Sequence, residues 1–184
     1  MLAHQANADQ SAWYPFAAEL ASQRYVVLTF NFRGFCPGEE SGCSPGKFDP
    51  PSAPEDLEGA VAFLKDQGVD KLFVVGASMG GTAALVPLPR RIDGIVAVSA
   101  PEEFRGLQAR PAGLKKIPTL FIAGREDPGA ADAAQSLYER APDPKQILLV
   151  SSEAHGAFLL DDPDTGAEVE QALLDFLDLY RDAA

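Results

Sequence analysis

The five residues Gly76-Ala-Ser-Met-Gly80 carry a serine between two glycines, and this spacing is compatible with nucleophilic chemistry. The apolar run Leu72–Val75 precedes the motif and the helix-forming run Thr82–Leu85 follows it, so the serine falls at a strand-to-helix turn. Such a turn imposes strained backbone angles on Ser78, needs small neighbours and projects the hydroxyl above the sheet. In this context we favour a nucleophilic serine over a structural Gly-Ser turn.

A serine hydroxyl is a poor nucleophile without a general base, and the sequence contains only two histidines, His4 and His155. His155 lies in the loop Ser151–Gly156, directly after the apolar run Gln146–Val150. A glycine-containing loop at that point allows an imidazole to swing over the serine. An isolated loop histidine is more often a simple surface residue, but its place after the serine and an acid in the chain favours His155 as the base.

The base needs a carboxylate that fixes its tautomer and stabilises the imidazolium. Asp127 follows the apolar run Pro118–Ala123 and lies three residues after Gly124. It should therefore lie at the carboxyl end of the strand that precedes the His155 strand. We prefer Asp127 to its rivals Glu126, Asp132 and Asp161, and predict a triad of Ser78, Asp127 and His155.

Short β-rich runs alternate with longer helical patterns along the chain, which predicts an α/β fold with a mostly parallel sheet and helices on both faces. We expect one domain over residues 1–184. The expected strands are the tail at Leu2–Ala3, then Tyr25–Phe30, Lys71–Val75, Gly94–Val98, Pro118–Ala123 and Gln146–Val150. The expected helices are Ser11–Gln23, Glu55–Gln67, Met79–Val86, Ala130–Arg140 and Thr165–Arg181.

The net charge of −12 argues against binding to a nucleic-acid backbone or to anionic lipid, and no apolar run is long enough to span a membrane. Cys36 and Cys43 close a loop rich in Gly and Pro, and their spacing is compatible with a disulfide or with two thiols. Neither a metal site nor a cofactor is expected. The chain would be cytoplasmic, or exported if the cysteines are bonded and a signal precedes Met1. The oligomeric state stays open.

The order Ser78, Asp127, His155 resembles that of the α/β-hydrolase family, specifically its compact bacterial members near the esterase and dienelactone-hydrolase-like groups. Further resemblances run in the right order over nearly the whole chain. His4-Gln-Ala6 is similar to the family's His-Gly-x turn, Trp13 stands where many members carry Trp, and Asn31-Phe-Arg-Gly-Phe35 is similar to the Asp-x-Arg-Gly-x segment.

The resemblance implies an oxyanion hole built from two backbone N–H groups. One would belong to Met79, and the other to Ala6, with Gln5 as the second choice. Gln5 replaces the usual glycine, which puts the shape of this turn in doubt. The resemblance implies structural roles for His4, bracing the turn, and for Arg33, holding its loop against the nucleophile elbow, the turn that carries Ser78. Ser78 also argues against the reaction of dienelactone hydrolases proper, which use cysteine.

Family members carry two strands before the one that begins here, and that strand normally lies between the fourth and fifth strands. We therefore expect that residues upstream of Met1 are missing. Residues 99–117 leave room for one short helix and no substantial lid, so the site should be open.

The expected substrate is a small-molecule carboxylic ester, cleaved through an acyl-enzyme intermediate. The alternatives are a catalytically silent binding protein or fragment on the same fold, or a serine peptidase or acyltransferase.

Overall fold

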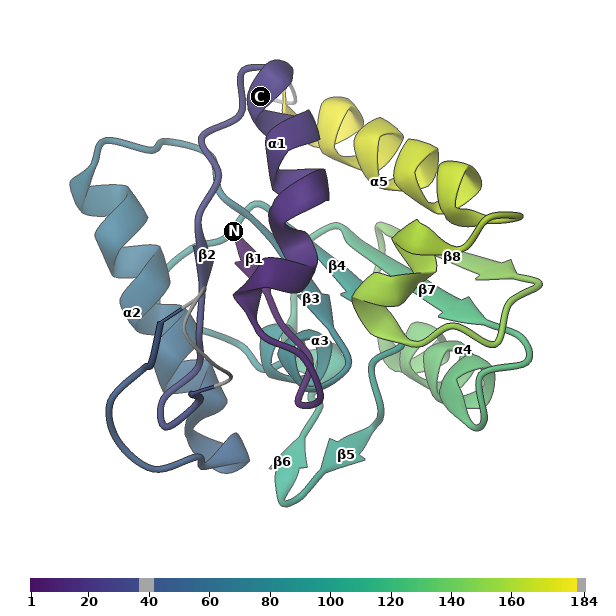
Figure 1. Cartoon of the computed structure of the whole chain (residues 1–184), viewed down its shortest axis with the longest axis horizontal. Coiled ribbons are helices and arrows are strands. Elements are labelled where there is room, and N and C mark those ends of the chain that lie inside the picture. The colour runs from purple at the N-terminus through teal and green to yellow at the C-terminus, as the bar shows by residue number, and fades with distance from the viewer. Residues whose placement is uncertain (37–41, 182–184) are drawn as a thin grey trace.

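The computed structural model describes residues 1–36 and 42–181, and its centre is a twisted sheet flanked by helices (Figure 1). Within these ranges, six strands form the sheet in the order β2-β1-β3-β4-β7-β8, and every neighbouring pair is parallel. Their bounds are β1 (Leu2–Ala3), β2 (Thr29–Phe30), β3 (Phe73–Ala77), β4 (Gly94–Val98), β7 (Thr119–Gly124) and β8 (Lys145–Val150). All their carboxyl ends therefore meet at one edge of the sheet, as expected from the sequence.

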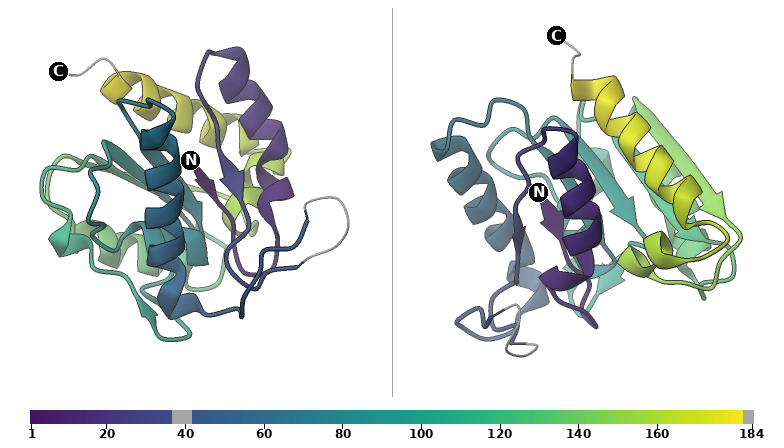
Figure 2. Two further views of the ribbon diagram at one scale, coloured as in Figure 1. Left: turned by 90° about the vertical axis from the view of Figure 1, so that its left-hand side faces the viewer. Right: turned by 45° about the horizontal axis from the view of Figure 1, so that its top comes forward.

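Helices cover both faces of the sheet (Figure 2). One face carries α1 (Tyr14–Ser22) and α5 (Gly166–Arg181), and the other carries α2 (Ala53–Asp66), α3 (Met79–Ala84) and α4 (Ala130–Arg140). Short 3₁₀ helices are η1 (Gln10–Trp13), η2 (Pro50–Ser52), η3 (Pro111–Gly113) and η4 (Gly156–Asp161).

Successive residues of the central strands alternate between two hydrophobic clusters. In β3, Val74 joins the cluster under α2, α3 and α4, whereas Val75 joins the cluster under α1 and α5. The pairs Ile95 and Val96 in β4 and Phe121 and Ile122 in β7 divide in the same way. Burial on both faces explains why these strands are continuous apolar runs in the sequence.

The predicted elements are present, with shifts of one or two residues at most ends. The largest difference is the predicted strand Tyr25–Phe30, of which only Thr29–Phe30 forms a ladder. A ladder needs a neighbour, and β1 offers only Leu2 and Ala3 for pairing. As the resemblance implied, β1 lies between β2 and β3, pairing Leu2 with Thr29 on one side and with Val75 on the other.

The segment between β4 and β7 contains a hairpin in addition to a short helix of the size that its length allowed. Strands β5 (Glu103–Phe104) and β6 (Leu107–Gln108) pair antiparallel, and η3 follows them. Arg105 and Gly106 both have positive φ, of 48° and 90°, as a two-residue hairpin turn with matching twist requires.

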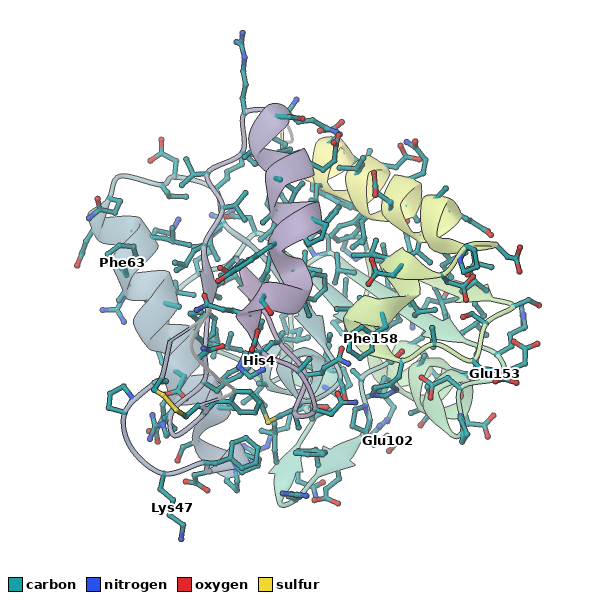
Figure 3. All side chains as sticks on the ribbon, viewed as in Figure 1. His4, Lys47, Phe63, Glu102, Glu153 and Phe158 are labelled. Carbon is teal, nitrogen blue, oxygen red and sulfur yellow. A yellow bond between two sulfur atoms is a disulfide. The ribbon has the colours of Figure 1, made fainter. Side chains whose placement is uncertain are left out.

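Cys36 and Cys43 form a disulfide, visible as the yellow bond in Figure 3, which decides between the two states that the spacing left open. The ring of Phe35, next to this bond, packs against His4 with centroids 4.5 Å apart. The disulfide therefore lies next to an aromatic residue that packs against the turn after β1. In the described ranges, none of the helices has the length and apolar character of a membrane span.

Candidate active site

Ser78 links β3 to α3 in a backbone conformation that a serine rarely adopts. Its φ is 47° and its ψ is −115°. The surrounding hydrogen bonds hold this turn: the Ser78 N–H donates to Val98 O at 2.8 Å, and Thr82 N–H donates to Ser78 O at 2.9 Å. The Thr82 hydroxyl adds a bond to Pro101 O at 2.8 Å. Strain of this kind persists only where its surroundings impose it, which is typical of a functional position.

Three glycines allow α3 to pack directly against the sheet at this turn. A Cβ on Gly76 would lie 2.4 Å from Gly80 O, and a Cβ on Gly80 would lie 2.5 Å from Ala3 O. A Cβ on Gly81 would lie 2.8 Å from Gly76 O. Because the opposing atoms are backbone, they cannot rotate away. The sequence pattern around the serine is therefore a steric requirement of the turn.

We expect Gly80→Ala to lower the free energy of unfolding by at least about 2 kcal/mol, because overpacking against backbone forces the strand and helix apart. Urea denaturation followed by circular dichroism measures the change. Gly59→Ala is the matched control, since Gly59 lies in helix α2 and a Cβ there would meet no atom of residues 1–36 and 42–181 within 4 Å. This control should be neutral or slightly stabilising. Equal stability of Gly80→Ala and wild type would contradict the steric account.

His155 and Asp127 form the second part of the site. Asp127 follows β7, His155 follows β8, and His155 Nδ1 lies 2.7 Å from Asp127 Oδ2. Asp127 is buried, whereas the side chain of His155 is 37% exposed. Against this carboxylate, Nδ1 carries the proton, which leaves Nε2 as the free acceptor of the neutral ring. The rival carboxylates Glu126, Asp132 and Asp161 are exposed.

The loop that carries His155 lies against the serine turn. A Cβ on Gly156 would lie 3.3 Å from Ala77 Cβ, so the residues next to His155 and Ser78 are in contact range. Strands β3, β7 and β8 are parallel, and the three predicted site residues follow their carboxyl ends. The fold therefore brings Ser78, Asp127 and His155 to one edge of the sheet.

A family model described as the alpha/beta hydrolase family matches residues 4–183, which is nearly the whole chain. The chain belongs to the alpha/beta hydrolase family. No curated protein matches this hydrolase in sequence.

Solved structures of other proteins share the fold of this α/β hydrolase. Esterase Pf2001 of Pyrococcus furiosus is 21% identical, with a TM-score of 0.76 over 97% of this chain and 81% of that one. A monoacylglycerol lipase of Paleococcus ferrophilus is 18% identical, with a TM-score of 0.71 over 96% and 92%. A dienelactone hydrolase of Anabaena variabilis is 20% identical, with a TM-score of 0.68 over 97% and 84%.

In this α/β hydrolase, the turn after β1 lies beside the serine turn. A Cβ on Gly80 would lie 2.8 Å from His4 O, which brings the backbone of this turn to the first residues of α3. Met79 and Gln5 are fully buried, and Ala6 is half-buried. The N–H groups of Met79 and of Ala6 or Gln5 stay the predicted oxyanion donors.

His4 braces this turn from inside the hydrolase, as the resemblance implied. Its Nε2 accepts from the Phe32 N–H at 3.1 Å, so the proton is on Nδ1, which donates to Gln5 O at 2.8 Å. His4 lies in the interior, whereas Lys47 and Glu153 point outward (Figure 3). Burial lowers the pKa of His4 below its usual value of 6.5.

We expect this hydrolase to lose stability as the pH falls below about 6.5, because unfolded His4 takes up a proton that the folded state refuses. The slope contributed by His4 has a limit of about 1.4 kcal/mol per pH unit. The amino group of Met1, whose pKa burial lowers to about 5, contributes with the same sign. Urea denaturation of wild type and of His4→Gln at several pH values between 7 and 5 therefore gives the slope of the free energy of unfolding against pH for each protein. The variant keeps an acceptor for Phe32 N–H and should show the shallower slope; identical slopes would contradict this assignment.

The prediction that Arg33 holds its loop against the serine turn was wrong. Arg33 Nε binds Asp56 Oδ1 at 2.7 Å, and its backbone N–H donates to Asp56 Oδ2 at 3.0 Å. Arg33 NH2 also lies 3.1 Å from Glu55 Oε2. Arg33 therefore fixes its loop to the first turn of α2 and not to the serine turn, because two carboxylates of that turn lie within bonding distance of it.

The side chain of Gln5 has a role that the sequence did not reveal. It is fully buried and its Oε1 accepts from the Ala157 N–H at 2.7 Å. The unusual residue at a position that is normally glycine was the available signal.

For metals, residues 1–36 and 42–181 contain no group of three or more His, Cys, Asp and Glu side chains arranged as a binding site.

Proposed function

We propose that this protein is a serine hydrolase that cleaves carboxylic esters through an acyl-enzyme intermediate, with Ser78, His155 and Asp127 as its catalytic triad. The observation that carries the proposal is the strained Ser78 turn with the His155–Asp127 pair at the same sheet edge. A structural serine turn has no need of a buried carboxylate paired to an imidazole beside it. Membership of the hydrolase family supports the reaction class.

In the proposed mechanism, His155 Nε2 takes the proton from the Ser78 hydroxyl as Oγ attacks the ester carbonyl. The N–H groups of Met79 and of Ala6 or Gln5 stabilise the oxyanion of the tetrahedral intermediate. The histidine then gives its proton to the leaving alcohol. The same histidine then deprotonates a water molecule that attacks the acyl carbon. The bond from the acyl carbon to Ser78 Oγ breaks, the histidine returns the proton to Oγ, and the acid leaves. Asp127 holds the Nδ1–H of His155 throughout and stabilises the imidazolium.

The exposure of His155 supports a substrate that approaches directly from solvent. The segment after β4 contains the hairpin of β5 and β6, and it is too short to form a substantial lid. Both features favour small soluble esters. The esterase and lipase among the structural relatives are consistent with ester chemistry, although their likeness concerns the fold.

A fluorophosphonate probe tests the proposal, because it reacts covalently with an activated serine and needs no knowledge of the substrate. We expect labelling at Ser78, located by peptide mass spectrometry, and hydrolysis of short p-nitrophenyl esters. Peptide p-nitroanilides of matched acyl groups separate esterase from peptidase activity. Absence of both labelling and ester hydrolysis in folded protein would overturn the proposal.

A further inference from the structure

We propose that the side chain of Gln5 is a positioning residue that holds the loop of His155 over the serine turn. This inference rests on the proposed function and extends it to the side chain of Gln5, which acts through His155 and not on the substrate. The starting observation is a contact between segments 152 residues apart, in which Gln5 Oε1 accepts from the Ala157 N–H at 2.7 Å.

The Gln5 amide binds the backbone on both sides of Gly156. Its Oε1 accepts from the Ala157 N–H, and its Nε2 lies 3.4 Å from the His155 carbonyl oxygen. An N–H group can only donate and a carbonyl can only accept, so these two partners fix the orientation of the amide. Nε2 also donates to Asn7 Oδ1 at 2.9 Å, which holds the amide plane in place.

Gly156 is shaped to receive this amide. Its φ is 63°, and a Cβ there would lie 2.1 Å from Gln5 Oε1. The glycine therefore allows both the left-handed turn and the close approach of the buried side chain. The two residues form a matched pair, in which the bulk of Gln5 occupies the space that any larger residue at position 156 would need.

Gln5 anchors one end of the His155 loop, and a separate contact anchors the other. At the start of the loop, the Ser152 hydroxyl bonds to Asp162 and accepts from the Ala154 N–H at 3.0 Å. After His155, the loop is held by Gln5. Asp127 fixes the ring at Nδ1, but the position of Nε2 relative to Ser78 depends on where the backbone carries the ring. Gln5 is therefore placed to set that distance.

The test measures kcat and KM for a p-nitrophenyl ester, with active sites counted by fluorophosphonate titration, in wild type, Gln5→Met and Gln5→Glu. Methionine keeps the volume of glutamine and removes all three hydrogen bonds of the amide, so we expect kcat to fall by roughly 10–100-fold with KM changed less than about threefold. Glutamate keeps an acceptor for the Ala157 N–H, but its second carboxylate oxygen faces the His155 carbonyl oxygen, so its kcat should also lie below that of wild type. Gln135→Met makes the same change on the exposed surface of α4 and should retain wild-type kinetics.

Wild-type kcat in folded Gln5→Met, whatever its melting temperature, would overturn the proposal, because a purely structural glutamine affects stability and not turnover per active site. Should Gln5→Met fail to fold, Gln5→Glu decides: a lowered kcat at unchanged KM supports the proposal, and a wild-type kcat overturns it. Failure of the wild type to react with the probe is a different result, since it would overturn the serine-hydrolase proposal itself.

Discussion

Replacing Ser78 by alanine is expected to reduce ester turnover by about a million-fold, if chemistry limits the rate. The variant loses the nucleophile, so the acyl-enzyme cannot form, and only binding and the oxyanion donors still act on the substrate. The backbone turn has a φ of 47° at this residue, which alanine tolerates no better than serine. The measurement is kcat for a p-nitrophenyl ester, together with loss of fluorophosphonate labelling.

Ser99→Ala is a close control for this substitution. Ser99 is also buried, also follows a central strand and also has a φ of 47°, and its hydroxyl has no hydrogen-bond partner among the described residues. It should therefore retain turnover, while melting temperatures of both variants show that folding is preserved. Unchanged turnover in Ser78→Ala would remove the basis of the proposed mechanism.

Asp127→Asn is expected to lower kcat by about ten-thousand-fold with the fold intact. The amide can present its NH₂ group to His155 Nδ1, which moves the ring proton to Nε2. A ring protonated at Nε2 cannot accept the serine proton, and the uncharged amide no longer stabilises the imidazolium. The contact to be altered is the 2.7 Å bond between Asp127 Oδ2 and His155 Nδ1.

Glu126→Gln is the matched control, because Glu126 is the neighbouring carboxylate and is exposed. It should leave kcat near the wild-type value. A small effect of Asp127→Asn combined with a large effect of Glu126→Gln would transfer the acid role to the neighbour. Small effects of both would show that His155 needs no carboxylate.

The sequence was sufficient to predict the elements that bury apolar side chains on both faces. Strands β3, β4 and β7 are continuous apolar runs, and Ala130–Arg140 forms a helix with the predicted bounds. The relation of Ser78, Asp127 and His155 to the carboxyl ends of parallel strands followed from their order alone. Such features depend on local pattern and on topology, which a single sequence carries.

Features that depend on a distant partner were not predictable. Tyr25–Leu28 has strand propensity, but a strand exists only where a neighbour pairs with it. The spacing of Cys36 and Cys43 could not determine whether they are bonded, and Arg33 could not be assigned to Asp56 across 23 residues. The role of Gln5 depends on a contact with Ala157 that no local pattern encodes. Gly106 was a signal for the hairpin, because glycine readily adopts the positive φ that the hairpin turn needs.

In the chain, the hairpin of β5 and β6 lies between the segment that carries the proposed nucleophile and the segment that carries the proposed acid and base. The nucleophile precedes it, on the strand-turn-helix unit of β3 and α3, whereas the acid and base follow it on adjacent strands β7 and β8. Its tip is the two-residue turn at Arg105 and Gly106, both exposed. The hairpin contacts α3, the helix that follows Ser78, so changing the length of its exposed tip would alter the surface beside that helix without altering either unit. Laboratory evolution of a new substrate range should therefore begin with length variation there.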